Sequence, residues 1–415
     1  MSRFKPTKHS SILEITGSKS DLLSGKRIVI GMTGSVAVLE IVNLARLLMR
    51  NGAEIFVVMS SAARELIQPD LVEWAVGNPV ITKLTGQIEH VHLCGQHPDK
   101  ADLLLIAPST ANTIGKIAQG IDDTPVTTFA TTAFGTGIPI AIVPAMHGTM
   151  YDNPMVIKNI KQLKDVGVTF IGPRIEEGKA KIAKNDEILE TIIGMLSKND
   201  LAKKKVVVTA GPTRIWIDEV RFISNPSTGR MGIEIAKEAA SRGAEVTLIL
   251  GPTNLPINNP TIKVESIETP QDIIEVINKQ KKIDLFISAA AIGDYQPEKQ
   301  KGKIPSRKES LTLKLEPTQK IIAHVKQKFP KARIVGFKAE VKATKSELIE
   351  KAQRSLKDYQ IDMVVANFLD KPDQGFESKT NEVILIKKND NITDLPLSSK
   401  RVIAEKIIDE FFSFN

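Results

Sequence analysis

The chain has 415 residues, of which 42% are hydrophobic and 25% charged, a balance typical of a globular protein. Its length favours two domains of roughly 200 residues each. No apolar run reaches the about 20 residues of a membrane span, and no apolar stretch of a secretory signal follows the basic N-terminus. A single cysteine excludes an internal disulfide framework and suits a reducing compartment. We therefore expect a cytoplasmic protein with no membrane-spanning segment.

The net charge of +8 raises the question of nucleic-acid binding. The basic residues are spread along the whole chain, and the sequence carries no nucleic-acid-binding motif. A mild basic excess is equally suited to phosphorylated small molecules. We expect small-molecule substrates and no nucleic-acid partner.

Apolar runs alternate with amphipathic helical stretches along the chain. The runs are almost continuously apolar, which is typical of strands buried on both faces of a parallel sheet. Helices between them predict right-handed βαβ units, and therefore an α/β fold with two Rossmann-like domains. Strands are expected at 26–32, 54–60, 101–108, 138–146 and 168–172 in the first half, and at 204–211, 245–251, 284–291, 333–340 and 362–368 in the second.

A polar, charged stretch separates these two series of strands. We place a linker at 196–203, between a domain at 25–195 and a domain at 204–415, with 1–24 as an N-terminal extension. Gly52 and Gly243 each stand between a helical stretch and a strand, where left-handed C-caps are expected. Ligands of open α/β sheets bind beyond the carboxyl ends of the strands, so the residues after each strand are the candidate site residues.

Hydroxyl and amide side chains follow several strands of the first half. "GMTGSVA" at 31–37 combines a glycine turn, a serine and the free N–H groups of a helix start, which can cradle a phosphate. It is not G-x-G-x-x-G, and no acidic residue ends the second strand to hold a ribose, which disfavours NAD. These residues suit a different phosphorylated cofactor, with contacts expected from Gly34, Ser35, Ser60, Ser109, Thr110 and Asn112.

The stretch "EHVHLCGQH" at 89–97 holds three of the six histidines and the only cysteine. It could be a zinc site, a Cys/His nucleophilic pair, or a segment with one proton-carrying histidine. Zinc needs three or four converging ligands, and the stretch lacks C-x-x-C. No acyl-transfer chemistry is otherwise indicated, which disfavours the nucleophilic pair. A histidine with its ordinary pKa near 6.5 suits proton transfer at neutral pH.

Four features of the first half occur together in a fixed order: "GMTGSVA", a histidine before the third strand, "APSTANT" (107–113) and "PAMHGTMY" (144–151). With them, residues 25–190 resemble the flavin-dependent cysteine decarboxylases, most closely the phosphopantothenoylcysteine decarboxylases. The resemblance implies a flavodoxin-like domain that binds FMN, with Ser35 and Ser60 at its phosphate. "HVHL" matches the family's histidine motif and implies that His90 is catalytic. In that family the flavin oxidises the substrate's cysteine portion to a thioaldehyde, CO2 leaves, and the enethiol is reduced.

The first half departs from that family in two places. His147 follows "PAM", where bacterial members have asparagine, and the flap-like segment 172–186 has no cysteine. The substrate contacts that we expect here are His147 and Lys181. Another group has to replace the flap cysteine, and Cys94, four residues from His90, is one hypothesis.

The second half contains "TAGPTRIWIDEVRFISNPSTGRMGIEIA" at 209–236. Backbone N–H groups, hydroxyls and a guanidinium converge there at a helix start, which predicts an anion site formed by Ser227, Thr228, Gly229 and Arg230. Further motifs follow: "SAAAIGDY" (288–295), "GKIPSRK" (302–308), "VGFKAE" (335–340) and "ANFLDKPDQGF" (366–376). With them, residues 203–411 resemble the phosphopantothenate–cysteine ligases.

This second resemblance implies a nucleotide-binding ligase domain. Such ligases activate the carboxylate of 4'-phosphopantothenate with CTP, as an acyl-cytidylate, and cysteine then displaces CMP. Mg2+ accompanies the triphosphate, although no metal ligands are assigned. The resemblance implies catalytic roles for Asn225 and Lys303, and CTP contacts from Ala290, Asp294, Lys303 and Phe337. Relatives have lysines where this chain has Ser355 and Tyr359, which leaves ATP open as the nucleotide.

Together the two resemblances imply a bifunctional enzyme of coenzyme A biosynthesis that ends at 4'-phosphopantetheine. The decarboxylase likeness also implies a homo-oligomer, trimer-based and up to a dodecamer. A nucleotide-dependent oxidoreductase of two Rossmann-like halves is the first alternative, and the absent dinucleotide motif disfavours it. A non-catalytic, flavoprotein-like regulatory subunit is the second, disfavoured because the functional residues above are retained.

Overall fold

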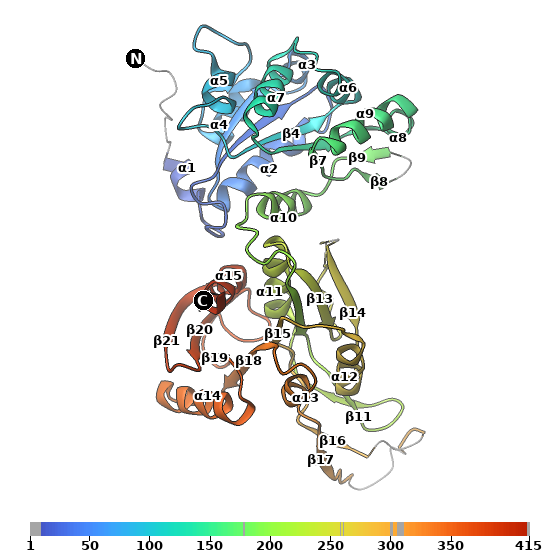
Figure 1. Ribbon diagram of the computed structural model, residues 1–415, viewed down its shortest axis with the longest axis vertical. Helices are drawn as coiled ribbons and strands as arrows, with labels where there is room; N and C mark the ends of the chain where they lie inside the picture. Colours follow the sequence, from blue (N-terminus) through green and yellow to red (C-terminus); the bar gives the residue numbers. More distant parts are fainter. Residues whose placement is uncertain are drawn as a thin grey trace. The chain divides into compact units, whose positions relative to one another are not determined.

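The computed structural model describes residues 10–176, 179–257, 259, 261–298, 302–304 and 311–412. Parts of the expected extension at 1–24 and of the basic loop at 298–308 lie outside this range. The chain divides into two compact units, Met1–Ser197 and Lys198–Asn415 (Figure 1). The proposed linker at 196–203 spans this division. None of the described helices is long and apolar enough to cross a membrane.

The N-terminal unit is built on a six-stranded parallel sheet with the order β3-β2-β1-β4-β5-β7. All five strands expected in this half are present in this sheet, and its short strand β3 was not expected. The chain order reverses between β1 and β4, where open α/β sheets bind ligands. The strands are Arg27–Met32 (β1), Glu54–Met59 (β2), Val80–Ile81 (β3), Leu103–Ser109 (β4), Ile140–Pro144 (β5) and Thr169–Phe170 (β7).

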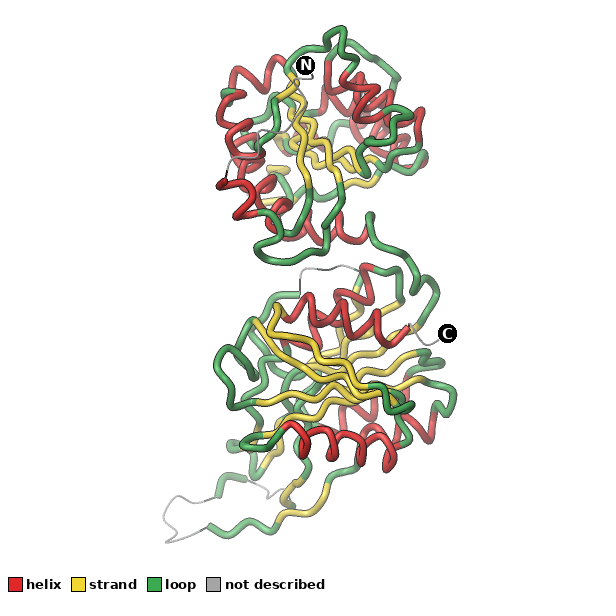
Figure 2. The backbone as a smooth tube through the Cα atoms, turned by 90° about the vertical axis from the view of Figure 1, so that its left-hand side faces the viewer, coloured by secondary structure: helices red, strands yellow, loops and turns green. Residues whose placement is uncertain are grey.

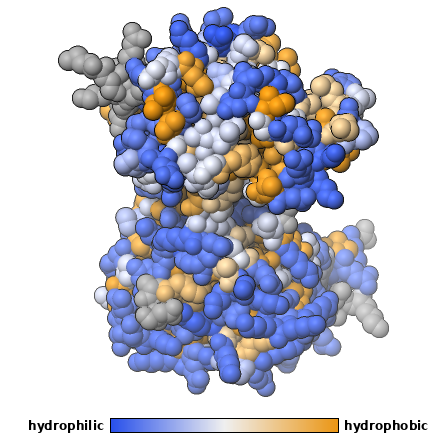
Figure 3. Space-filling model, turned by 45° about the horizontal axis from the view of Figure 1, so that its top comes forward, coloured by the Kyte–Doolittle hydropathy of each residue, from blue (hydrophilic) through white to orange (hydrophobic). Residues whose placement is uncertain are grey.

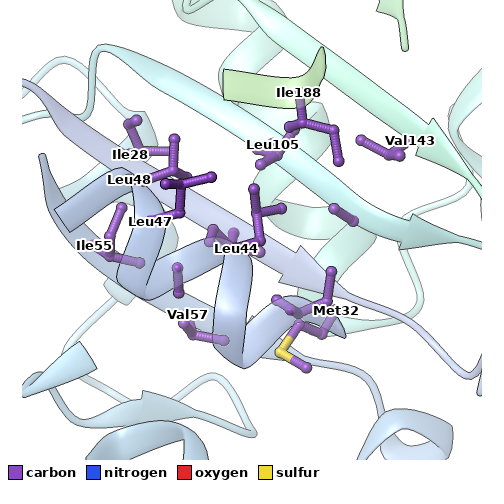
Figure 4. Close-up of a cluster of buried hydrophobic side chains, with 14 of the residues drawn as sticks. Ile28, Met32, Leu44, Leu47, Leu48, Ile55, Val57, Leu105, Val143 and Ile188 are labelled. Atoms are coloured by element: carbon purple, nitrogen blue, oxygen red, sulfur yellow. The ribbon is translucent and has the colours of Figure 1, made fainter. Parts of the chain in front are cut away.

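Helices cover both faces of this sheet (Figure 2). On α2, Ile41, Leu44 and Leu48 recur at helical spacing and turn one apolar face to the sheet. Figure 4 shows Leu44 and Leu48 among side chains of β1, β2 and β4. One face carries α1 (Ser10–Ile15), α2 (Val38–Arg50), α4 (Pro69–Val76) and α10 (Asn185–Met195), and the other α5 (Glu89–Cys94), α6 (Ala111–Ala118), α7 (Pro125–Thr136) and α9 (Pro154–Asp165).

Two short helices and a small antiparallel sheet complete the N-terminal unit near the strand ends. The helices are α3 (Ser61–Leu66) and α8 (Gly148–Tyr151). The small sheet has the order β6-β9-β8, formed by Met146–His147 (β6), Lys179–Lys181 (β9) and Arg174–Glu176 (β8). It joins the segment after β5 to the flap-like segment.

The C-terminal unit is built on an eight-stranded sheet with the order β14-β13-β10-β15-β18-β19-β20-β21. The first six strands in this order are parallel to one another. The strands are Lys205–Ala210 (β10), Glu245–Leu250 (β13), Ile262–Ser266 (β14), Leu285–Ser288 (β15), Arg333–Glu340 (β18), Met363–Phe368 (β19), Thr380–Lys387 (β20) and Ile392–Ser399 (β21).

The sequence analysis expected parallel strands only, and this is wrong for one edge of the second sheet. β20 and β21 run antiparallel. The connection between β19 and β20, residues 369–379, contains no helix. A parallel return needs a crossover of a dozen or more residues, usually helical, so this short link brings the chain back antiparallel.

Helices cover both faces of the second sheet as well. On one face lie α11 (Arg230–Ser241) and α15 (Lys400–Phe412), and on the other α12 (Pro270–Lys279), α13 (Ile321–Lys328) and α14 (Lys345–Tyr359). Two small hairpins pair Arg214–Trp216 (β11) with Phe222–Ser224 (β12), and Tyr295–Pro297 (β16) with Leu315–Pro317 (β17). The expected C-caps Gly52 and Gly243 have φ of +100° and +86°.

Phe129 on α7 is 0% exposed, whereas Phe134 on the same helix is 38% exposed. We expect Phe129→Ala to lower the free energy of unfolding by about 3–5 kcal/mol, because it leaves a cavity in the core. Phe134→Ala is the matched control, with an expected loss of about 1 kcal/mol or less. Urea denaturation followed by circular dichroism measures both, and equal losses would contradict this core assignment.

Candidate active sites

The ends of β1, β2 and β4 form one connected edge in the N-terminal unit. The Thr33 hydroxyl, just after β1, accepts from the Thr110 backbone N–H at 3.1 Å, next to the end of β4. The Ser60 N–H, just after β2, donates to the Met32 carbonyl at 3.0 Å. The structure therefore brings the residues predicted to bind the cofactor to one side of the sheet.

Gly34 permits a close approach between the turn after β1 and the start of α3. A Cβ atom on Gly34 would lie 2.5 Å from the Cβ of Ala62, which is far below a normal contact distance. Ser60 is the N-cap of α3, and its hydroxyl accepts from the Ala63 N–H at 3.2 Å. The two serines expected at a phosphate, Ser35 and Ser60, therefore sit on neighbouring strand ends beside a helix start.

Among the buried polar atoms of this unit, Ser109 Oγ and His90 Nδ1 have no hydrogen-bond partner within the described chain. Thr110 caps α6 with its hydroxyl, and Asn112 is exposed in the first turn of that helix. An unsatisfied buried polar atom costs about 1–3 kcal/mol, and bound polar groups commonly satisfy such atoms. Ser109 and His90 therefore fit a site for a polar cofactor.

His90 lies in the first turn of α5, with its ring edge-on to Phe129 at 6.5 Å between centroids. The start of this helix is fixed by Glu89, which is 5% exposed and accepts from the Thr85 N–H at 3.0 Å and from the Thr85 hydroxyl. Burial raises the pKa of Glu89, but these hydrogen bonds outweigh it and hold the pKa below its ordinary value. A buried carboxylate therefore anchors the turn that carries His90.

The other residues of this segment have different environments. The rings of His92 and His97 lie 4.1 Å apart between centroids. Cys94 is fully buried, and burial raises the pKa of its thiol to about 12. Such a thiol is neither a thiolate nucleophile nor accessible to a substrate. Across the described residues, no group of three or more His, Cys, Asp or Glu side chains could hold a metal ion, so the zinc hypothesis gains no support.

The two predicted substrate contacts, His147 and Lys181, lie on paired strands of the small sheet. His147 pairs with Lys179 across β6 and β9, and its Nδ1 lies 3.1 Å from the Thr149 hydroxyl. Lys181 forms an ion pair with Glu176 at 3.3 Å. The flap-like segment is thus joined directly to the strand of His147, which sequence spacing alone did not reveal.

A cavity of about 520 Å³ lies beside the carboxyl ends of β15 and β18 in the C-terminal unit. Its wall includes most residues predicted for this half: Asn225, Ser227, Gly229, Arg230, Ala290, Asp294 and Phe337. Thr228 lies in the same loop and donates its hydroxyl to the Phe376 carbonyl at 2.8 Å. Lys303 is exposed on the segment 302–304 and is not part of the wall that the described residues form.

The loop before α11 aims a helix N-terminus at this cavity. Gly229 caps the helix with φ of +79°, and its N–H donates to the Ser227 hydroxyl at 3.3 Å. A Cβ on Gly229 would come within 3.0 Å of the Gly211 backbone nitrogen. This glycine therefore permits both the left-handed turn and the close approach of two loops, and the helix start can bind an anion.

Lys320, which the sequence analysis missed, forms an ion pair with Asp294 at 2.5 Å at the cavity wall. Burial lowers the pKa of Lys320, but the hydrogen bond to Asp294 outweighs it and raises the pKa above its ordinary value. The Asp294 carbonyl accepts from the Thr318 N–H at 2.9 Å. The orientation of Asp294 is thus set from two sides.

Asp218, also missed, anchors the segment that carries Lys303. Its carboxylate is 0% exposed and accepts from the N–H groups of Val220 (2.8 Å), Arg221 (2.7 Å) and Ile304 (3.0 Å). Burial raises the pKa of Asp218, but these bonds outweigh it and lower the pKa to about 2. The available signal was an acid directly after the apolar "IWI", where Asp218 begins the acidic pair "DE".

Comparison with known proteins identifies both units. The family model described as "Flavoprotein" matches residues 16–197, and "DNA/pantothenate metabolism flavoprotein C-terminal domain" matches residues 201–414. The chain is therefore a two-domain α/β flavoprotein of pantothenate metabolism. The "Coenzyme A biosynthesis bifunctional protein CoaBC" of Thermococcus kodakarensis is 48% identical over 95% of this chain and 97% of the relative. The chain belongs to this CoaBC family.

The chain is also similar to a second relative and to a solved structure. The Methanocaldococcus jannaschii protein of the same name is 35% identical over 95% of this chain and 96% of the relative. The crystal structure of the C-terminal domain of a CoaBC protein covers 51% of this chain and 96% of its own, with 32% identity and a TM-score of 0.42. The chain is a bifunctional enzyme of coenzyme A biosynthesis, with a flavoprotein decarboxylase domain followed by a ligase domain.

Asp218→Ala removes the acceptor of three backbone N–H groups. We expect the amides of Val220, Arg221 and Ile304 to exchange hydrogen about tenfold faster or more, because each loses a charge-assisted hydrogen bond. Hydrogen exchange with mass spectrometry at neutral pH measures this, and the Asp272→Ala variant, which alters a different cap, is the control. Unchanged exchange at Ile304 would show that Asp218 does not hold this segment.

Proposed function

We propose that this enzyme converts 4'-phosphopantothenate, cysteine and CTP to 4'-phosphopantetheine, with ligation in the C-terminal unit and decarboxylation in the N-terminal unit. The observation that carries the proposal is a pair of polar sites at the carboxyl edges of two sheets. One holds His90 and the unsatisfied Ser109 hydroxyl, and the other is the cavity with Arg230 in its wall. The ligase product is the decarboxylase substrate, so one chain supplies consecutive steps.

In the ligation, the carboxylate of 4'-phosphopantothenate attacks the α-phosphorus of CTP and pyrophosphate leaves. The amine of cysteine then attacks the acyl carbon of the acyl-cytidylate, and CMP leaves. Arg230 and the N–H groups at the start of α11 stabilise the phosphoryl charge, with Mg2+ accompanying the triphosphate. Asn225, whose amide donates to the Ala291 carbonyl at 3.3 Å, contacts the acyl-nucleotide.

Further residues complete the proposed ligase site. The nucleotide contacts in this proposal are Ala290, Phe337 and Asp294. Their position in the cavity wall supports this assignment. Lys303 approaches the phosphates from the segment that Asp218 anchors. Ser227, Thr228 and Gly229 shape the anion-binding turn.

In the decarboxylation, FMN bound at this edge would supply the two-electron redox chemistry that the reaction at the cysteine portion of the substrate needs. Ser35 and Ser60, with the N–H groups around Gly34, hold the cofactor phosphate. Ser109, Thr110 and Asn112 line the rest of the cofactor site. His90 moves a proton at its imidazole. His147 and Lys181, joined by the small sheet, bind the substrate beside this edge.

We propose that the enzyme is a trimer-based homo-oligomer in the cytoplasm. Val36 and Leu39, next to the phosphate-binding turn, are 76% and 66% exposed. Figure 3 shows apolar surface on the N-terminal unit between hydrophilic regions. Exposed apolar area of this kind is typical of an interface, so association of subunits near the cofactor site would bury it.

His90→Asn tests the decarboxylase assignment. We expect CO2 release from phosphopantothenoylcysteine to fall by about 10²–10⁴-fold, because the imidazole that moves the proton is gone. The yellow colour and flavin absorbance of the purified protein should persist, as should pyrophosphate release. His97→Asn, in the same segment, is the control and should retain normal turnover. A His90→Asn variant with normal CO2 release would refute the role of His90.

Asn225→Ala tests the ligase assignment of the C-terminal unit. We expect pyrophosphate release with CTP and 4'-phosphopantothenate to fall by about 10²–10³-fold, since a hydrogen-bonding group at the reacting centre is lost. Decarboxylation of supplied phosphopantothenoylcysteine should be unchanged. Repeating the assay with ATP determines the nucleotide. If the natural chain released no pyrophosphate with either nucleotide, the proposed ligation would be wrong.

A further inference from the structure

Lys400 is a buried lysine in the wall of the ligase cavity. It is 4% exposed and is the first residue of α15. Its ammonium donates to the carbonyls of Gly375 at 2.8 Å and Phe376 at 3.3 Å, which are uncharged partners. An ammonium group has three N–H donors, so one remains for a ligand.

Arg230, the first residue of α11, is the second cation at this place. Its Nε is buried and has no hydrogen-bond partner among the described residues. Burial, and next the positive charge of Arg230, lower the pKa of Lys400 to about 8. Two like charges that share a poorly hydrated site repel each other, and an anion bound between them removes this cost.

The other charged groups of the cavity wall do not supply that anion. Asp294 is paired with Lys320 at 2.5 Å, and Lys338 is paired with Glu340 at 3.1 Å. The charge interactions found for Lys400 in the described chain come from Arg230 alone. The positive ends of α11 and α15 lie at the same two cations and add to the positive potential.

We propose that Lys400 and Arg230 form a two-cation subsite for a phosphoryl group. The inference rests on the proposed ligase function and adds a residue to it. The phosphoryl group comes either from the polyphosphate of the nucleotide or from the phosphate ester of 4'-phosphopantothenate.

The turn at 375–376 holds this subsite in place before a ligand binds. The Phe376 carbonyl accepts both from the Lys400 ammonium and from the Thr228 hydroxyl at 2.8 Å. One carbonyl thus connects the loop before α11 with the start of α15. Because the Lys400 ammonium and the loop that leads into Arg230 are held by the same turn, the Lys400 side chain loses little entropy when the anion binds.

Lys400→Gln tests the subsite in the full-length protein, because glutamine removes the charge but keeps donors for the two carbonyls. Lys406→Gln, an exposed position on the same helix, is the matched control. Calorimetry measures the binding of inorganic pyrophosphate, CTP and 4'-phosphopantothenate. We expect Lys400→Gln to weaken at least one of these phosphoryl ligands by about tenfold or more, as for a lost charge-assisted contact, and Lys406→Gln to change none.

The set of ligands whose affinity falls in Lys400→Gln identifies which molecule provides the phosphoryl group. Weaker pyrophosphate and CTP binding assigns the subsite to the nucleotide, and weaker 4'-phosphopantothenate binding assigns it to the substrate. Unchanged affinity for all three ligands overturns the subsite, even if the variant is less stable. In that case normal pyrophosphate release by the natural chain would still support the ligase function.

A second measurement on the natural chain covers the case in which Lys400→Gln does not fold. Lys400 loses its proton as pH rises through about 8, so the affinity for the phosphoryl ligand should fall between pH 7 and pH 9.5. The fall should be about tenfold per pH unit at most. An affinity that stays constant over this range overturns the proposal.

Discussion

The alignment of parallel strands is the constraint on which both sites depend. Parallel strands buried on both faces end at the same edge of a sheet, and the polar groups of this protein follow those ends. In the N-terminal unit the Thr33 hydroxyl connects the end of β1 to Thr110 after β4. In the C-terminal unit the Thr209 hydroxyl, in β10, accepts from the Ala290 N–H after β15 at 3.3 Å. In each unit a threonine hydroxyl near the end of the central strand thus connects that strand to the residues that end or follow its neighbour.

At each of these sheet edges, a glycine lets two backbone segments come close together beside the candidate site. Gly34 brings the turn after β1 against α3, and Gly229 brings the loop before α11 against Gly211. A side chain at either position would push a helix start away from the neighbouring strand end. The helix N-termini are useful for binding phosphate only because these glycines let them come so near.

The sequence predicted the parallel strands well because a fully buried strand leaves a continuous apolar run. It did not predict the parallel strands β3 and β14 or the antiparallel strands β20 and β21. β21 alternates exposed and half-buried residues and contains Pro396, which weakens its strand signal. The candidate site followed from motifs where the residue stands at or directly after a strand end, as Ser109 at the end of β4 and Asn225 after β12 do. It did not include Lys320 or Lys400, whose importance depends on contacts across the fold that the order of residues does not show.

Lys303 is exposed although the residue next to it is held in place by a buried carboxylate. The lysine itself is exposed, while the neighbouring Ile304 donates its N–H to the fully buried carboxylate of Asp218. An exposed lysine next to an anchored residue can extend toward phosphate groups although it is not part of the cavity wall that the described residues form. The sequence marks the lysine, but only the structure connects it to a residue more than eighty positions earlier.

The helix pair α11 and α15 shows that the fold can neutralise a buried cation where neutrality is needed. At the far end of α11, Arg242 is 4% exposed and contacts Glu238 at 2.6 Å and Asp409 at 2.7 Å. At the cavity end, the Lys400 ammonium has only carbonyls as hydrogen-bond partners, and the buried Nε of Arg230 has none among the described residues. Stability alone would favour the first arrangement at both ends, since an uncompensated buried charge is costly. The difference is explained if the missing negative charge at the cavity end arrives with the ligand.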